Sequence, residues 1–307
     1  MRNKIAFIFP GQGSQAVGMG KSLYENSRTA QRIFDQADDL LGLNIKKFCF
    51  EGPEEELKQT RITQPAITVT AIAAYEVLKE QGFLPSITAG HSLGEYCALY
   101  AAGAVDFEKV LRLVKKRGEL MNIKNPGTMA AVIGLEESKI KAICAQTEGR
   151  VIIANYNAPD QLVIAGEEET MKKVSEEIKL AGAKRVIPLS VSGAFHSPLM
   201  RGAAEEFEKF LAGFEIADGQ IPIVMNATAQ PATDSQTIKK NLAVQILSPV
   251  LWVDSVRSIW QEGVNTFIEV GPGRVLSGLV KRILPEAQTL NFSSIEDLSL
   301  IASVYAL

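Results

Sequence analysis

The sequence contains only two histidines, and each lies in a segment that could contribute half of an acyl-transfer site. His91 is part of the segment Gly90–Gly94, with the sequence GHSLG, and His196 lies in FHSP. A serine hydroxyl is a poor nucleophile at its ordinary pKa and needs a nearby base, which is most often histidine. Because histidine is so scarce here, few residues could be that base. We therefore ask whether Ser92 is a nucleophile and His196 its base.

The GHSLG segment matches the pattern G-x-S-x-G, which is typical of a nucleophile elbow. It follows a short apolar run at Ile87–Ala89 and precedes a run of small apolar residues at 93–103. A strand before the turn and a helix after it would expose Ser92, with helix N-terminal N–H groups near the reacting oxygen. A glycine-rich turn that merely opens a helix is the alternative. The strand and helix on either side favour the elbow.

The two histidines differ in how well they could serve Ser92. Adjacent residues at a sharp turn point in different directions, so we give His91 a supporting role in shaping the elbow. His196 is the remaining candidate base, although a purely structural histidine is the alternative. No Asp or Glu lies in the few residues before His196. A distant carboxylate or a main-chain carbonyl would therefore have to orient its imidazole.

Two further features could bind a substrate. In the loop Pro10–Gln15, glycines on both sides of Gln12 would let its backbone N–H approach a ligand closely. That N–H could pair with the N–H of Leu93 to form an oxyanion hole. Phosphate binding is the alternative, but the loop lacks both G-x-G-x-x-G and a G-K-[ST] ending. Arg117 ends the basic run 115–117, which indicates either a solvated helix face or a bidentate clamp for a substrate carboxylate.

The order of predicted elements indicates an α/β protein with two domains. Strands expected at 4–9, 87–89, 221–225 and 266–270 alternate with helices expected at 28–42, 64–81, 93–103, 106–121, 198–212, 235–246 and 253–262, and a further helix is expected after Gly271–Gly273. This alternation predicts a mostly parallel sheet. Between 128 and 192 the order is βαββαβ, which is typical of a ferredoxin-like unit. We therefore expect a large domain at 1–125 and 197–307 that carries a small domain at 126–196.

Composition narrows the functional classes. Charged residues make up 22% of the chain and the formal net charge is −3, which argues against a nucleic-acid binder. Three scattered cysteines and two histidines offer no pairs at zinc-ligand spacing, so we expect no metal site. The apolar run after the N-terminus is too short for a signal peptide, and no stretch reaches membrane-spanning length. We expect a cytoplasmic protein that does not act at a membrane.

Taken together, these segments resemble malonyl-CoA:acyl-carrier-protein transacylases, including the acyltransferase domains of polyketide synthases. The resemblance extends over nearly the whole chain and depends on six motifs in a fixed order. They are Pro10–Gln15 (PGQGSQ), Gln64–Ala66 (QPA), Gly90–Glu95 (GHSLGE), Arg117–Gly118 (RG), Gly193–Ser197 (GAFHS) and Glu269–Gly273 (EVGPG). Several motifs in order are far more specific than any one of them.

This resemblance implies a fold, a reaction and roles for individual residues. The fold would be an α/β-hydrolase-like large domain with a ferredoxin-like small domain. The reaction would be malonyl transfer from malonyl-CoA to the phosphopantetheine thiol of an acyl carrier protein, with no permanently bound cofactor. The implied roles are Ser92 as nucleophile, His196 as base, Gln12 and Leu93 as oxyanion hole, Arg117 for the malonyl carboxylate, Gln245 for orienting the histidine, and Phe195 for malonyl selectivity.

Other functions remain open at this stage. The carrier protein could serve fatty-acid synthesis or, in a trans-acting enzyme, polyketide synthesis. A serine esterase or thioesterase would share the elbow. However, α/β hydrolases place their histidine late in the chain, whereas a long segment follows His196. A non-catalytic module that binds a carrier protein is the third possibility, which the pairing of Ser92 with His196 argues against.

Overall fold

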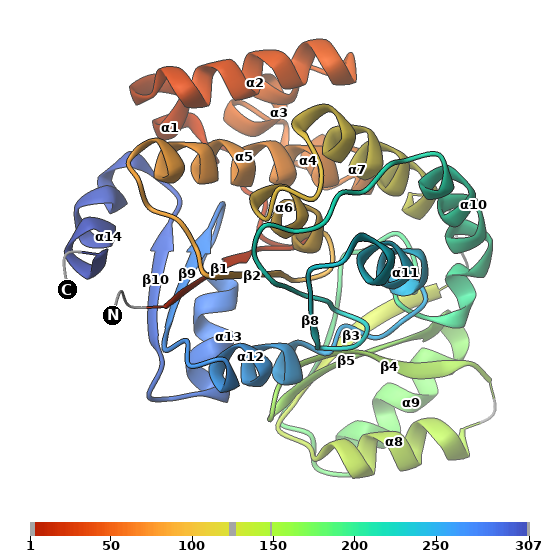
Figure 1. Cartoon of the computed structure of the whole chain (residues 1–307). Helices are drawn as coiled ribbons and strands as arrows, with labels where there is room; N and C mark the ends of the chain where they lie inside the picture. The colour runs from red at the N-terminus through yellow and green to blue at the C-terminus, as the bar shows by residue number, and fades with distance from the viewer. Residues whose placement is uncertain (1–3, 123–126, 148, 306–307) are drawn as a thin grey trace.

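The computed structural model describes residues 4–122, 127–147 and 149–305. Its larger sheet has six strands in the order β10-β9-β1-β2-β7-β8 (Figure 1). All neighbouring pairs are parallel except β7 and β8. The strands are β1 (Ile5–Phe9), β2 (Ile87–Gly90), β7 (Ile223–Val224), β8 (Pro231–Ala232), β9 (Thr266–Val270) and β10 (Gln288–Phe292). The prediction of an α/β protein with a mostly parallel sheet is thus confirmed.

Helices cover both faces of this sheet, as its apolar central strand requires. β1 has the sequence IAFIF and every residue in it is buried, which is typical of a parallel strand packed on both sides. On one face lie α5, α6 and α7, with α2 outside them, and on the other lie α12 and α13 (Figure 1). Their bounds are α2 (Arg28–Leu41), α5 (Thr60–Glu80), α6 (Gly94–Ala101), α7 (Phe107–Met121), α12 (Trp252–Gln261) and α13 (Val275–Ile283).

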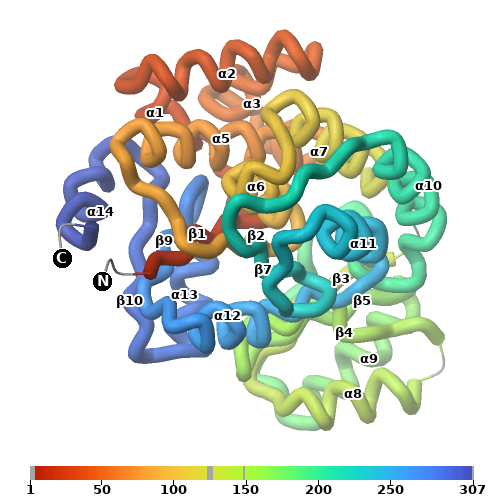
Figure 2. The backbone as a smooth tube through the Cα atoms, viewed as in Figure 1, coloured from red at the N-terminus to blue at the C-terminus, as the bar shows by residue number. Residues whose placement is uncertain are grey.

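Six further helices and two 3₁₀ turns complete the described residues of the larger part of the molecule. Figure 2 shows that α10 lies beside α7, although the two are far apart in sequence, and that α14 packs at the β10 edge near the N-terminal end. These helices are α1 (Lys21–Asn26), α3 (Ile45–Phe50), α4 (Glu54–Leu57), α10 (Arg201–Ala212), α11 (Ser235–Gln245) and α14 (Leu298–Tyr305), with 3₁₀ turns at Pro198–Met200 and Ile295–Asp297. No helix in the described ranges is both long and apolar enough to cross a bilayer.

A second, antiparallel sheet has four strands in the order β4-β5-β3-β6. Helices α8 and α9 pack on it around a separate apolar core. Its elements follow the predicted βαββαβ order: β3 (Gly127–Ile133), α8 (Glu137–Gln146), β4 (Val151–Ala158), β5 (Gln161–Glu167), α9 (Glu168–Leu180) and β6 (Arg185–Pro188). The Val250 N–H and carbonyl bond to Ala154 and Tyr156 at 2.9 Å each, which joins β4 to the larger part of the molecule.

Some predicted boundaries were wrong for identifiable reasons. β4 continues to Ala158, three residues beyond the strand expected at 151–155, because irregularities at Ile153/Asn155 and Tyr156/Ala158 interrupt the alternating pattern. α5 begins at Thr60 instead of 64, with the Gln59 carbonyl accepting hydrogen bonds from Ile62 and Thr63. Only two residues of the strand predicted at 221–225 pair as β7. β6 covers only 185–188 of the strand expected at 184–191. Strands β8 and β10 and the helices α1, α3, α4 and α14 were not predicted.

Candidate active site

Ser92 lies at the sharp turn between β2 and α6, in a backbone conformation that side-chain-bearing residues rarely adopt (φ 50°). The two glycines of the turn are required by close packing. A Cβ on Gly90 would lie 1.9 Å from the Gly94 carbonyl carbon, and a Cβ on Gly94 would lie 2.0 Å from the Phe9 oxygen. Asn226, two residues after the end of β7, holds the turn: its Oδ1 accepts from the Ser92 N–H and its Nδ2 donates to the Gly90 carbonyl, each at 2.6 Å.

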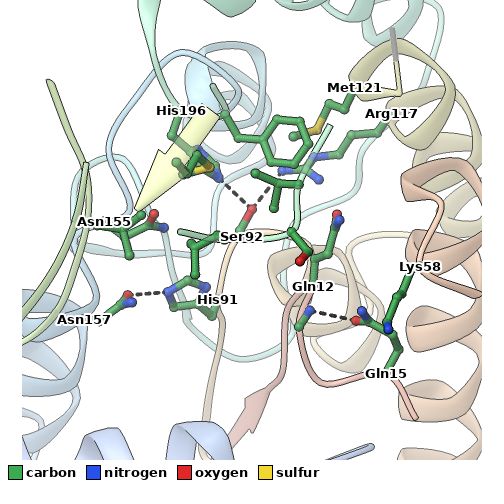
Figure 3. Close-up of a pocket in the computed structure, with 17 residues that line it drawn as sticks. Gln12, Gln15, Lys58, His91, Ser92, Arg117, Met121, Asn155, Asn157 and His196 are labelled. Atoms are coloured by element: carbon green, nitrogen blue, oxygen red, sulfur yellow. Dashed lines mark hydrogen bonds between the residues drawn. The ribbon is translucent and has the colours of Figure 1, made fainter. Parts of the chain in front are cut away.

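His196 contacts the Ser92 hydroxyl, with 2.7 Å between Oγ and Nε2 (Figure 3). On the other side of the ring, Nδ1 lies 3.0 Å from the main-chain carbonyls of Gln245 and Ser248. Because both carbonyls can only accept, the hydrogen of a neutral imidazole belongs on Nδ1, which leaves the Nε2 lone pair for the Ser92 hydroxyl. Main-chain carbonyls therefore occupy the position that a carboxylate has in a Ser-His-Asp triad.

The electrostatic surroundings keep this imidazole neutral. His196 is 3% exposed. Burial, assisted by the positive charge of Arg117, lowers the pKa of His196 to about 3. At neutral pH the ring is thus an unprotonated base in contact with a hydroxyl, as general-base catalysis requires.

Arg117 is buried in the site and is not part of a solvated helix face. Its side chain, on α7, is 1% exposed, and its Nη2 lies 3.0 Å from Ser92 Oγ and 3.1 Å from Gln245 Oε1. Figure 3 shows Ser92 between His196 and Arg117. Burial of the charged group lowers the pKa of Arg117 from its ordinary value. A guanidinium held this close to a nucleophile can meet a negatively charged group on an acyl chain.

Gln245 contributes both its main chain and its side chain. Its carbonyl contacts His196, whereas its side-chain amide bridges other groups: Nε2 donates to the Ser92 carbonyl at 2.9 Å and to Glu95 Oε1 at 3.1 Å. Glu95, on α6, is fully buried, and its other oxygen accepts from the Asn226 N–H at 2.5 Å. Burial raises the pKa of Glu95 to about 7.

The two candidate oxyanion donors are the backbone amides of Gln12 and Leu93, which come from different segments of the chain. Gln12 and Gly13 line the same cavity as Ser92, and the Leu93 N–H belongs to the next peptide in the chain. Within the described ranges, neither the Gln12 nor the Leu93 amide hydrogen has a partner in the protein. Both are therefore available to a negatively charged oxygen.

The cavity around Ser92 has a volume of about 280 Å³. Its wall combines apolar side chains with the polar groups already described. The apolar residues are Met121, Met129, Val163, Leu189, Val191 and Phe195. The Leu93 side chain is buried and does not line the cavity. His91 also reaches the cavity, but its Nε2 bonds Asn157 Oδ1 at 2.8 Å (Figure 3). Its ring packs edge-on against Trp252.

Comparison with known proteins identifies the family. The model of the acyl transferase domain family matches residues 6–298. The chain belongs to this family. It is 46% identical over 304 residues to a malonyl CoA-acyl carrier protein transacylase of Bacillus subtilis, with 97% of this chain and 96% of that protein covered.

Two further matches show the range of relatives of this acyl transferase. A polyketide biosynthesis malonyl CoA-acyl carrier protein transacylase of Bacillus subtilis, PksC, is 44% identical, with 93% of this chain and 99% of that protein covered. A crystal structure of an acyl carrier protein S-malonyltransferase from Vibrio cholerae has a TM-score of 0.94 and 40% identity, with 97% of this chain and 100% of that chain covered.

The structure of this acyl transferase brings Ser92, His196, Arg117 and Gln245 together from four separate segments. Sequence reasoning missed Glu95 and Asn226. Glu95 directly follows the GHSLG segment, but a glutamate is rarely fully buried, and nothing adjacent in the sequence marks this one as an exception. Asn226 follows a two-residue strand, and nothing in the adjacent sequence distinguishes it from other loop asparagines.

Proposed function

We propose that this acyl transferase moves a malonyl group from malonyl-CoA to the phosphopantetheine thiol of an acyl carrier protein through a malonyl ester on Ser92. The observation that carries the proposal is the position of the Ser92 hydroxyl, which lies between a neutral imidazole and a buried guanidinium. The similar proteins from Bacillus subtilis and Vibrio cholerae are named for malonyl transfer to acyl carrier protein, which supports the same substrates here.

In the first half-reaction, Ser92 Oγ attacks the thioester carbonyl while His196 Nε2 takes the hydroxyl proton. The carbonyl oxygen becomes negative and accepts hydrogen bonds from the Gln12 and Leu93 amides, an effect worth about 3 kcal/mol per donor in other enzymes. The C–S bond then breaks, and His196 returns the proton to the departing CoA thiol. The second half-reaction is the reverse sequence, with the carrier thiol as the attacking group.

Arg117 would bind the free carboxylate of the malonyl group. The carboxylate carbon of malonate is two bonds from the acyl carbon, a separation of about 2.5 Å. Arg117 Nη2 lies 3.0 Å from Ser92 Oγ, so a carboxylate on an acyl chain attached there falls within its reach. Because the guanidinium is buried, a charge-assisted bond to it would be strong.

Phe195 would restrict the size of the acyl chain. It lines the cavity immediately before His196 and is 6% exposed, so a branch on the acyl chain would have to displace it.

No cofactor is needed for any step. The absence of a bound cofactor and the cytoplasmic location both stay predictions.

The finer description of the fold is part of this proposal. An α/β-hydrolase-like large domain at 1–125 and 197–307 would carry a ferredoxin-like small domain at 126–196. The strand order β6-β3-β5-β4 supports the ferredoxin-like description of the small domain. When its four strands are numbered along the chain, they lie in the order 4-1-3-2. The boundary at 125/126 lies outside the described residues.

The test is to trap the acyl-enzyme. Wild-type protein incubated with radiolabelled malonyl-CoA should retain label on the peptide that contains Ser92, and holo carrier protein should remove it. The Ser92→Ala variant should retain none. Label that persists on Ser92→Ala contradicts the proposal. Rapid release of free malonate without a carrier thiol would favour a thioesterase.

The carrier protein could belong to fatty-acid or polyketide synthesis, and the PksC match keeps the second possibility open. We favour the first, because the relative matched with higher identity carries a general transacylase name. Comparing kcat/KM for the two kinds of holo carrier would decide between them.

A further inference from the structure

Glu95 is the buried carboxylate at the centre of the contacts around Ser92. It is fully buried, and each of its oxygens accepts a hydrogen bond from a different segment. Oε2 accepts from the Asn226 N–H, and Oε1 accepts from Gln245 Nε2. Neither donor belongs to α6, so this one side chain ties the nucleophile's helix to the segment after β7 and to the end of α11.

Each of those two partners also positions one half of the reacting pair. Asn226 fixes the turn that carries Ser92, because its side chain bonds both the Ser92 N–H and the Gly90 carbonyl. Gln245 holds the imidazole, because its carbonyl contacts His196 Nδ1. The hydroxyl and the imidazole thus reach their 2.7 Å contact through residues that share Glu95 as acceptor.

We propose that Glu95 is a positioning residue for acyl transfer, acting as an ionised carboxylate that aligns Ser92 through Asn226 and His196 through Gln245. This inference rests on the proposed function, since it concerns the same Ser92–His196 pair. It assigns Glu95 no contact with substrate.

The carboxylate form is required because Glu95 faces donors on both sides. A carboxylate can accept at both oxygens, whereas a neutral acid or an amide must present a hydrogen on one side. That hydrogen would oppose either the Asn226 N–H or Gln245 Nε2. Turning the Gln245 amide over would not help, because its Nε2 would then face the Arg117 guanidinium in place of Oε1.

This requirement makes the alignment dependent on pH. Of the charged side chains around Glu95, Arg117 from α7 favours the carboxylate. Tyr96, on the same helix as Glu95, is a neutral neighbour whose own pKa is raised by burial and by the Glu95 charge. Burial outweighs Arg117 and raises the pKa of Glu95 to about 7. Activity should therefore fall as the pH drops through about 7, far above the pKa of His196 at about 3.

The central variant is Glu95→Gln, which keeps the shape and removes the second acceptor. One buried donor then lacks a partner, so the rate of Ser92 acylation should fall by about 5- to 150-fold. Since the amide resembles the protonated acid, the remaining rate should no longer depend on pH around 7.

Glu269 provides the matched control. It is also a fully buried glutamate that accepts two backbone hydrogen bonds, from Leu276 and Ser277 at the start of α13. Glu269→Gln should lower the free energy of unfolding by a similar amount and leave the acylation rate within about twofold. NMR of the imidazoles adds a direct readout, because the chain has only two histidines. In Glu95→Gln the Nδ1-protonated form of His196 should give way to a mixture of tautomers.

The outcomes separate the inference from the function on which it rests. A wild type that forms no malonyl adduct overturns both. If wild type and Glu269→Gln acylate normally, then the inference alone is overturned by a Glu95→Gln rate equal to wild type. It is also overturned if Glu95→Gln keeps the wild-type dependence on pH.

Discussion

Replacing Arg117 with alanine should separate malonyl transfer from acyl transfer in general. The guanidinium is 1% exposed, and its Nη2 lies 3.0 Å from Ser92 Oγ. The carboxylate of a malonyl group attached to Ser92 would therefore lie within reach of the guanidinium. Acetyl-CoA has the same thioester but no carboxylate. We therefore expect Arg117→Ala to lower kcat/KM much more for malonyl-CoA than for acetyl-CoA.

The size of the difference follows from burial. Removing one partner of a buried charge pair leaves the other charge uncompensated and costs about 3–5 kcal/mol. That corresponds to a loss of about 150- to 5,000-fold in kcat/KM for malonyl-CoA. For acetyl-CoA the variant loses only the hydrogen bond to Ser92 Oγ, about 0.5–1.5 kcal/mol or roughly 2- to 13-fold. The ratio of the two losses should thus be at least about tenfold.

The pH profile of the same variant gives a second readout. The positive charge of Arg117 lowers the pKa values of both His196 and Glu95. Without it both values rise, so the acidic limb of the acetyl-transfer rate should move to higher pH. A limb that moves to lower pH would contradict the electrostatic account.

The assay is steady-state transfer to a holo carrier protein with each acyl-CoA, together with a thermal unfolding curve for each variant. Lys116→Ala is the control, because Lys116 precedes Arg117 on α7 but is only half-buried and does not line the cavity. Equal losses for malonyl- and acetyl-CoA would refute the assignment of Arg117 to the carboxylate.

Two further predictions concern the elbow and the cavity. Gly94→Ala would place a Cβ 2.0 Å from the Phe9 oxygen, so this variant should give little folded protein by circular dichroism. The control is Gly278→Ala in α13, where the new Cβ would have no atom within 4 Å, so its free energy of unfolding should equal the wild-type value or exceed it by up to about 1 kcal/mol. A soluble, active Gly94→Ala would disprove the packing argument. Phe195→Ala should raise the ratio of methylmalonyl to malonyl transfer by about 10- to 200-fold, measured as relative kcat/KM, and an unchanged ratio would remove Phe195 from selectivity.

The sequence pointed to Ser92 and His196 as the proposed reacting pair because their types are rare and their local setting is distinctive. With two histidines and one G-x-S-x-G turn after a strand, few pairings were possible. Arg117 was harder to interpret, since a basic run usually lies on a solvated face. Its position on the apolar stripe of α7, with Leu113, Val114 and Met121, is the signal that could have shown its burial.

Residues that act through distant contacts could not be found in this way. Asn226 matters because its side chain reaches Ser92 and Gly90, and that contact arises only when β7 pairs with β2. The resemblance assigned Gln245 to orienting the histidine, and the structure places its main chain there. A main-chain carbonyl carries no side-chain signature, so no sequence pattern could indicate that it contacts the imidazole.

Orientation of His196 by carbonyls also bears on the choice of acceptor. Without a carboxylate partner, and with Arg117 nearby, the imidazole is a weak base with a pKa of about 3. Binding of a malonyl carboxylate would offset the Arg117 charge and raise that pKa, so the base gains strength only when substrate is present. Even then a thiol, with a pKa near 8.5, is far easier to deprotonate than water, at about 15.7. A weak base therefore favours attack by the carrier thiol over hydrolysis, which is the distinction that a transferase sharing its elbow with hydrolases must make.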